Sequence, residues 1–309
     1  MKVASIGECM IEFSAAGGGL FARGFGGDTL NTAVYLSRLG IDAAYVTALG
    51  DDAMSEAMLA AWQAEGIDTR EVLRIPGRVP GLYLIERDAH GERSFLYWRD
   101  HAPAREFFDR ADDAALERLA GFDWLYLSGI SLSLYGETGR ARLRELLVTL
   151  RRRGGRLAFD GNYRPRGWSD AETARRAFNA ILPLVDLALP TFEDEQALFG
   201  DVDGAACIAR IRAHGIGEIV VKRGALGCLI EAAGQRSEIP PPHVVQPVDT
   251  TAAGDSFNAA YLAARISGAA PEQAAQAGHR LASVVIMSPG AVIAREAMPK
   301  DVLSIGASR

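Results

Sequence analysis

The chain has 309 residues, of which 49% are apolar and 23% charged, so it is long enough to bury one large core. This composition is typical of globular proteins and excludes a chain that is disordered throughout. The 33 basic and 39 acidic residues leave a formal charge of −6, which argues against binding to nucleic acid or to an anionic membrane surface. We therefore expect no nucleic acid and no membrane as partners.

The cysteines and the first residues indicate the cellular compartment in which we expect the protein. Cys9, Cys207 and Cys228 are odd in number and lack CxxC spacing, so the sequence predicts reduced thiols and neither a disulfide framework nor a zinc site. The opening MKVASIGECMIEF lacks a secretory apolar region, and the chain has no apolar run of about 18 residues. We expect a cytoplasmic protein.

Strands and helices alternate along most of the chain. Apolar or β-branched runs predict strands at residues 2–8, 43–50, 123–129, 156–162, 187–191 and 218–224. Apolar residues at helical spacing predict helices over residues 28–39, 54–62 and 137–153. Because the strands lead into helices, the pattern predicts an α/β fold with a mostly parallel sheet covered on both faces. No Pro/Ser/Gly linker divides residues 1–309, so we expect one domain.

One stretch departs from this alternation. Residues 81–88 and 92–100 alternate in polarity on either side of Ala-His-Gly at 89–91, which predicts an antiparallel hairpin. Such a hairpin does not fit the parallel order of the main sheet. We interpret it as part of a small β-sheet, here called the lid, formed by about residues 11–25 and 78–103.

The strongest chemical signal is VDTTAAGDSFNAAYLAA at residues 248–264. Small residues before a helix let an anion approach several backbone N–H groups, where the helix dipole is also favourable. An Asp at such a place is often only a helix cap. Asp255, however, follows Gly254 and the small residues, where a carboxylate can accept the proton of an attacking hydroxyl.

The second signal is GFGGDTLNTAVYLSRLG at residues 24–40. Gly26 and Gly27 permit close backbone approach, and Asp28 and Asn31 lie where a helix begins and can bind hydroxyl groups. Thr29 stands where a GxGxxG motif needs its third glycine, and GxxxxGK[ST] is absent. NAD binding and P-loop chemistry therefore lose support.

Together these motifs resemble the paired signatures of the PfkB (ribokinase-like) carbohydrate kinases, and the resemblance covers the whole chain. Within that family the chain is most similar to the branch acting on 2-keto-3-deoxygluconate, through GECMIEF, GFGGDTLNT, PGLYLIE, FLYWR, FDGNYRPR, VVKRGA, DTTAAGDSF and REAMP in that order. The resemblance implies a ribokinase-like three-layer sandwich with a β-lid. It also implies transfer of the ATP γ-phosphoryl group, assisted by Mg²⁺, to the 6-hydroxyl of that sugar acid.

The family's roles carry over residue by residue. Asp255 matches the catalytic base, and the backbone N–H groups of residues 252–255, here called the anion hole, match the family's phosphoryl site; it includes Ala252, Ala253 and Gly254. The resemblance assigns substrate binding to Gly27, Asp28, Asn31, Tyr83, Tyr97, Arg99 and Arg164. Arg99 suits this role, because a guanidinium binds a carboxylate with two hydrogen bonds. The alternative is that FLYWR is only an aromatic strand with an exposed Arg.

The resemblance assigns ATP binding to Asn162, Arg164, Lys222, Gly224, Gly227, Ala252 and Gly254. By itself, Lys222 would more often be a surface charge. The family's Asn-x-x-Glu reads Thr-Phe-Glu-Asp at residues 191–194, which makes Asp194 the carboxylate expected near Mg²⁺, through water. Glu8 and Glu12 are either sugar ligands or buried structural residues, and the sequence slightly favours the structural role.

Three other functions remain open at this point. A fructokinase or ribokinase would differ in needing no substrate carboxylate. A catalytically silent sugar-sensing module is disfavoured by Gly254 and Asp255, and an NAD-dependent oxidoreductase rests only on the βαβ pattern. The apolar lid strands also predict a homodimer formed through the lid.

Overall fold

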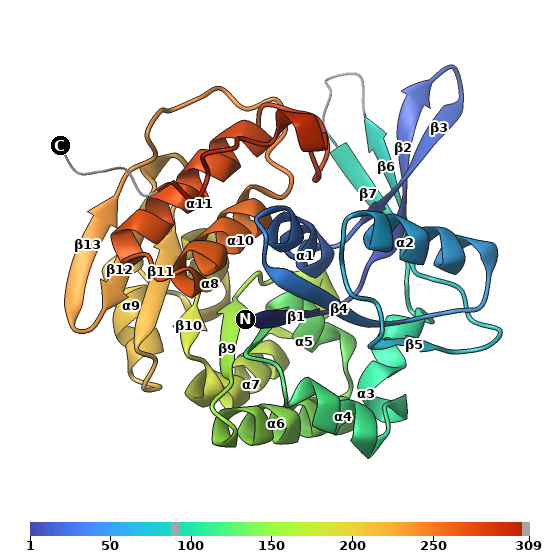
Figure 1. Ribbon diagram of the computed structural model, residues 1–309, viewed down its shortest axis with the longest axis horizontal. Coiled ribbons are helices and arrows are strands. Elements are labelled where there is room, and N and C mark those ends of the chain that lie inside the picture. The colour runs from blue at the N-terminus through green and yellow to red at the C-terminus, as the bar shows by residue number, and fades with distance from the viewer. Residues whose placement is uncertain (88–92, 305–309) are drawn as a thin grey trace.

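The computed structural model describes residues 1–87 and 93–304, which contain a nine-stranded central sheet (Figure 1). Its order is β13 (Gln235–Ile239), β12 (Cys228–Ala232), β11 (Glu218–Lys222), β10 (Leu187–Ala188), β9 (Arg156–Asp160), β8 (Trp124–Ser128), β1 (Lys2–Ile6), β4 (Asp42–Leu49) and β5 (Val72–Arg74). The strands from β11 to β5 run parallel, whereas β12 and β13 are antiparallel. All six predicted strands are confirmed.

Helices cover both faces of this sheet, as the alternating pattern predicts (Figure 1). One face carries α1 (Asp28–Arg38), α2 (Ala53–Ala64), α10 (Ala253–Ile266) and α11 (Pro271–Val285). The other carries α3 (Phe107–Arg110), α4 (Asp113–Leu119), α5 (Gly129–Leu134), α6 (Glu137–Arg152), α7 (Ala171–Ile181), α8 (Phe192–Phe199) and α9 (Gly204–Arg212). Single 3₁₀ turns occur at Pro103–Glu106, Pro165–Gly167, Leu182–Leu184, Gly224–Leu226 and Arg295–Ala297. The three layers enclose separate cores above and below the sheet, because each helix buries one apolar stripe.

The lid is a separate four-stranded sheet that projects from one end of the main sheet (Figure 1). Its order is β3 (Leu20–Gly26), β2 (Met10–Gly17), β6 (Leu82–Arg87) and β7 (Arg93–Trp98), with β2 and β6 parallel and the other pairs antiparallel. The predicted hairpin is confirmed by the pairing of β6 with β7. Its Ala-His-Gly turn at 89–91 lies outside the described residues.

Side chains of the lid alternate between two faces, as the pleat of a strand requires. Tyr83, Phe95 and Tyr97 lie on one face, where their rings contact one another. Leu96 and Trp98 lie on the opposite face and remain 47% and 58% exposed. Only the part of this second face around Leu96 and Trp98 is open to solvent, because Ile11, Phe25 and Leu82 on the same face pack against the core.

Two further predictions from the sequence concern membrane-spanning segments and the cysteines. Among the helices that the structure describes, none combines the length and the apolar character needed to cross a bilayer. Cys9, Cys207 and Cys228 are buried and unpaired, as the odd number and spacing predict.

Candidate active site

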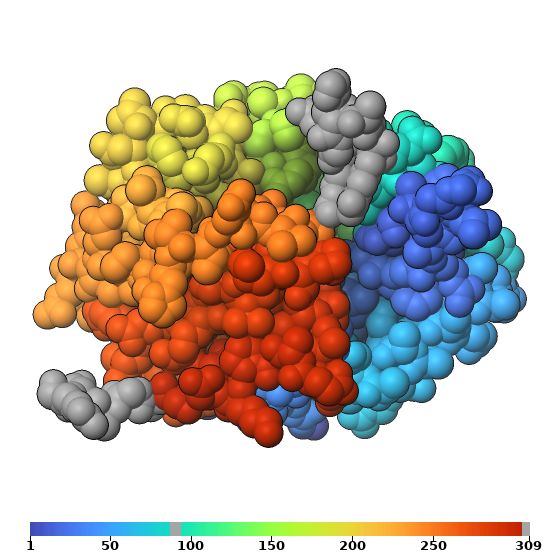
Figure 2. All heavy atoms as spheres, turned by 90° about the horizontal axis from the view of Figure 1, so that it is seen from above, coloured from blue at the N-terminus to red at the C-terminus, as the bar shows by residue number. Residues whose placement is uncertain are grey.

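Polar residues from distant parts of the chain meet at the carboxyl ends of the parallel strands. Glu8 follows β1, Ser128 ends β8, Asp160 ends β9 and Lys222 ends β11. Asn31 in the first turn of α1 bonds Asp255 in the first turn of α10, so the two helix starts meet, and Figure 2 shows the N-terminal part of the chain (blue) beside its C-terminal part (red). Open parallel sheets place their ligands at the carboxyl ends of their strands.

Asp255 lies in the first turn of α10 and is buried, with 8% of its surface exposed. Asn31 Nδ2 donates a hydrogen bond of 2.8 Å to Asp255 Oδ2 and so connects the two predicted motifs. Burial, followed by the nearby charge of Asp28, raises the pKa of Asp255 to about 8. A carboxyl with a pKa near neutrality suits proton transfer.

The start of α10 lies within residues 252–255, the predicted anion hole. The helix begins at Ala253, two residues before Asp255, and Ala252 adopts left-handed angles with φ 59° and ψ 16°. The N–H of Ala253 donates to the carbonyl of Thr250 at 3.2 Å, so this member of the anion hole is already engaged. Among the residues that the structure describes, no side chain caps this helix, so its first N–H groups are not engaged by a cap.

Lys222 is buried, which excludes the surface-charge alternative. Its Nζ donates to Asp160 Oδ2 at 3.2 Å and to Asn258 Oδ1 at 3.0 Å. A Cβ added to Gly254 would lie 3.4 Å from this Nζ, so the ammonium group lies directly beside the anion hole. Lys222 and the backbone N–H groups at the start of α10 therefore place a positive charge and hydrogen-bond donors side by side, as an anion site requires.

Sequence reasoning missed three members of this network. Asn258 Nδ2 donates to Asp160 Oδ2 at 2.8 Å and to Tyr126 Oη at 3.0 Å, so these residues fix the position of Lys222. Asp160 and Asn258 are in the quoted motifs FDGN and GDSFN, and their polarity within apolar surroundings was the available signal.

Asp28, one of the residues expected to bind sugar, lies at the start of α1 and bonds a residue of another motif. Asn162 Nδ2 donates to Asp28 Oδ2 at 2.7 Å, although the resemblance assigns Asn162 to ATP. Burial raises the pKa of Asp28, against hydrogen bonds from Ser128 and Thr29. Packing alone requires a glycine at position 27, because a Cβ there would lie 2.2 Å from the carbonyl oxygen of Glu8.

The lid residues singled out by the sequence have internal partners. Tyr83 donates through its hydroxyl to Glu12, and its ring centroid is 5.9 Å from that of Tyr97. Arg99 forms an ion pair with the buried Glu8. Arg99 is thus not simply an exposed residue, and Glu8 and Glu12 each bond a lid residue and do not pair with each other.

Arg164 and Asp194 form an ion pair of 2.9 Å at the rim of the site. Burial raises the pKa of Asp194, while Arg164 opposes this effect. On the expected nucleotide side, Gly224 has φ 53° and Gly227 has φ 83°. A Cβ on Gly227 would lie 2.2 Å from the carbonyl oxygen of Ile239, so packing and the positive φ together explain this glycine without a ligand.

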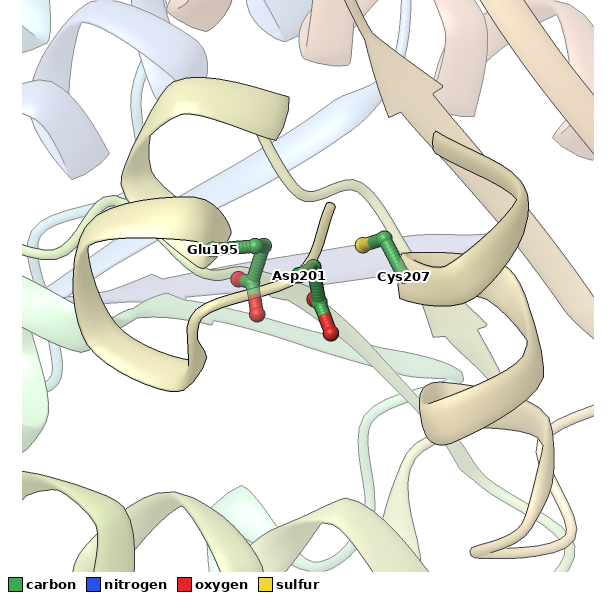
Figure 3. A group of neighbouring side chains, drawn as sticks. All are labelled: Glu195, Asp201 and Cys207. Atoms are coloured by element: carbon green, nitrogen blue, oxygen red, sulfur yellow. The ribbon is translucent and has the colours of Figure 1, made fainter. Parts of the chain in front are cut away.

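A second group of possible metal ligands comprises Glu195, Asp201 and Cys207, from α8, the loop after it, and α9 (Figure 3). Their ligand atoms lie within 4.8 Å of one another. Arg210 Nη2, however, donates to both carboxylates at 2.7 Å, and the guanidinium stacks 3.8 Å from the Phe199 ring centroid. Because the guanidinium of Arg210 already bonds both carboxylates, and burial raises the pKa of Glu195 to about 7, we interpret the group as structural.

The fold and this site match a known class of enzyme. The model of the pfkB family of carbohydrate kinases matches residues 1–298, and the chain belongs to this family. The 2-dehydro-3-deoxygluconokinase of Escherichia coli K12 is 49% identical over 96% of this chain and 99% of its own length. That of Dickeya dadantii is 47% identical over 96% and 98%.

Two further comparisons are more distant. A fructokinase of Klebsiella pneumoniae is 30% identical over 96% of this chain and 95% of its own length. The crystal structure of an Escherichia coli ribokinase II in complex with ATP and Mg²⁺ has a TM-score of 0.84 at 23% identity and covers 96% of both chains. This likeness shows the ribokinase-like fold, which the sequence predicted.

Proposed function

We propose that the chain transfers the γ-phosphoryl group of ATP to the 6-hydroxyl of 2-keto-3-deoxygluconate, giving the 6-phosphate and ADP. The observation that carries this proposal is the buried Asp255 beside Lys222 and the amide end of α10. A proton acceptor and an anion site in contact are what in-line phosphoryl transfer to an alcohol requires. The 49% identity to a 2-dehydro-3-deoxygluconokinase over nearly the full length supports the substrate.

The residues divide the work by their chemistry. Asp255 accepts the proton of the attacking hydroxyl, and Asn31 fixes its carboxylate through the 2.8 Å hydrogen bond. Lys222 and the N–H groups of Gly254 and Asp255 stabilise negative charge on the transferred phosphoryl group. Asp28, oriented by Asn162, binds sugar hydroxyls.

The oxygen donors of the site fit Mg²⁺, which accompanies ATP. Asp160 Oδ1 is buried and has no hydrogen-bond partner among the described residues, and Asp194 offers a second carboxylate nearby. Carboxylate and water oxygens are the ligands that Mg²⁺ prefers. We propose that Asp194, through water, and Asp160 would hold the ion, which supplies charge neutralisation when bound.

Arg99 distinguishes a sugar acid from a neutral sugar in this proposal. Arg99→Ala should cost about 2 to 5 kcal/mol in kcat/KM for the keto acid, because a desolvated carboxylate loses its partner. The cost for fructose should stay below about 1 kcal/mol. A coupled ADP-release assay with both substrates at saturating MgATP measures this difference. The ratio of the two values cancels any loss of folded protein.

Two outcomes contradict the substrate assignment. Wild type could prefer fructose, or the Arg99→Ala variant could lose both substrates equally. Either result leaves a neutral-sugar kinase of the same family as the better function. ATP consumption with any sugar excludes a silent sensing module.

We further propose a homodimer formed through the exposed apolar face of the lid. Leu96, Trp98 and Phe21 lie on that face, and Phe21 is 46% exposed. Exposed apolar surface of this kind usually marks an interface. We also place the enzyme in the cytoplasm, where ATP is present and its three buried thiols stay reduced.

A further inference from the structure

Glu8 is a buried carboxylate that the reaction chemistry above does not use. Only 3% of its surface is exposed, and its Oε2 accepts a hydrogen bond from Arg99 Nη2. The two residues are 91 positions apart, so this contact joins the end of β1 to the end of β7 in the lid. Arg99 itself keeps 21% of its side chain exposed, although its Nε is buried.

The surroundings of this pair are tightly constrained. Gly81 lies against it, because a Cβ there would be 2.9 Å from Glu8 Oε1 and 3.2 Å from Arg99 Cβ. Backbone packing of Gly27 against the Glu8 carbonyl fixes the other side. These two glycines therefore allow Glu8 and the base of the Arg99 side chain to pack closely.

Two polar atoms of the pair have no hydrogen-bond partner among the described residues: Glu8 Oε1 and Arg99 Nε. A buried polar atom without a hydrogen bond lowers the stability of the folded protein, so its presence calls for an explanation such as a bound ligand. Besides Arg99, the charged groups that act on Glu8 are Arg105, which is attractive, and Asp28, which is repulsive. The Glu8 carboxylate thus lies within electrostatic reach of the sugar-side residue Asp28.

We propose that Glu8 is a positioning residue for substrate specificity: it orients the Arg99 guanidinium toward the substrate carboxylate and lowers the affinity for that carboxylate by its own negative charge. This inference rests on the proposed sugar-acid function. One edge of the guanidinium bonds Glu8 and another remains for the ligand, as the several donors of Arg allow. The bound substrate then places a second carboxylate near the first, and the two repel each other.

The proposal predicts that KM for the keto acid changes in opposite directions when Glu8 loses its charge and when its side chain is shortened. Glu8→Gln keeps an oxygen that can accept from Arg99 but loses the charge, so KM for the keto acid should fall about threefold to tenfold. Glu8→Asp keeps the charge but is one methylene shorter, so Arg99 loses its orientation and KM should rise roughly tenfold. Both variants should leave kcat and the KM for fructose within about twofold of wild type, because neither change touches the phosphoryl site.

The experiment measures kcat and KM for the keto acid and for fructose in wild type, both Glu8 variants and Glu65→Gln. Glu65 is a matched control, because it also pairs with arginines, Arg38 and Arg295, but it follows the end of α2 and its ion-pair partners are not lid residues. It should leave the ratio of keto acid to fructose unchanged. Circular dichroism and Tm confirm that each variant is folded.

The outcomes separate this inference from the function on which it rests. If wild type prefers the keto acid and the two Glu8 variants shift its KM in opposite directions, the inference is supported. If wild type prefers the keto acid but both variants lower activity on both substrates alike, Glu8 is only structural and the inference is overturned. A wild type that prefers fructose overturns the proposed function and the inference together.

Discussion

Asp255→Asn tests the centre of the proposed chemistry. The amide oxygen of Asn can accept the 2.8 Å hydrogen bond from Asn31, so the shape of the site should be preserved. The amide cannot accept a proton from the sugar hydroxyl. We expect kcat to fall by about 10² to 10⁴ while sugar binding changes by less than about threefold, the usual range for loss of a general base.

The raised pKa of Asp255 adds a pH dependence with a defined sign. Burial and the charge of Asp28 raise this pKa from 3.8 to about 8, so the ligand-free enzyme at pH 7 holds the proton. We expect kcat/KM for the sugar acid to increase with pH up to about 8, as the carboxylate forms. In the unfolded chain the same group ionises near its ordinary value of 3.8.

Stability must therefore decrease as pH rises between these two pKa values, because the folded protein binds more protons than the unfolded chain. Each pH unit in this window costs about 1.4 kcal/mol for a group that titrates alone, or about 2 to 3 °C in Tm for a chain of this size. The Asn variant lacks this group. Its Tm advantage over wild type should grow from pH 5 to pH 8.

Three measurements check this reasoning: coupled ADP release, calorimetric sugar binding, and Tm at pH 5 to 8. Asp113→Asn serves as a control, because Asp113 is fully exposed on α4 and should give a Tm difference that does not vary with pH. Near-normal turnover of the Asp255 variant would remove Asp255 from proton transfer. A pH-independent Tm difference would show that its pKa is not raised by burial.

The remaining predictions concern the phosphoryl site. Lys222→Met should lower kcat/KM about 10² to 10³-fold in steady-state assays and also lower Tm, because Asp160 is left buried without its cation. A surface lysine would instead show less than a twofold effect. Ala252→Gly should raise the unfolding free energy by about 0.5 to 1 kcal/mol in denaturant titrations, because Ala252 has a φ of 59° that glycine adopts without strain. A decrease would contradict the left-handed conformation.

Local sequence predicted the elements that depend on neighbouring residues. The strands and the helices at 28–39 and 137–153 follow from hydrophobic periodicity, and α6 indeed buries Leu143, Leu146, Leu147 and Leu150 on one stripe. The lid hairpin followed from its period of two. The amide end of α10 was predictable because small residues before a helix are visible in the sequence itself. Most of the candidate site residues were identified from the family motifs, which can also be read directly in the sequence.

Tertiary structure decided which charges are paired and buried. Asn31 and Asp255 are 224 residues apart, and Lys222 meets Asp160 across 62 residues, so no local pattern could reveal these bonds. The same holds for Glu8, which follows a strand of the main sheet, whereas its partner Arg99 follows a strand of the lid. The physical reason is that burial and electrostatic interaction depend on distance in space, which is set by the order of strands and not by spacing along the chain. The sequence by itself determined the elements and the reactive groups, whereas the packing of the sheets determined the partners, the burial and the pKa shifts of those groups.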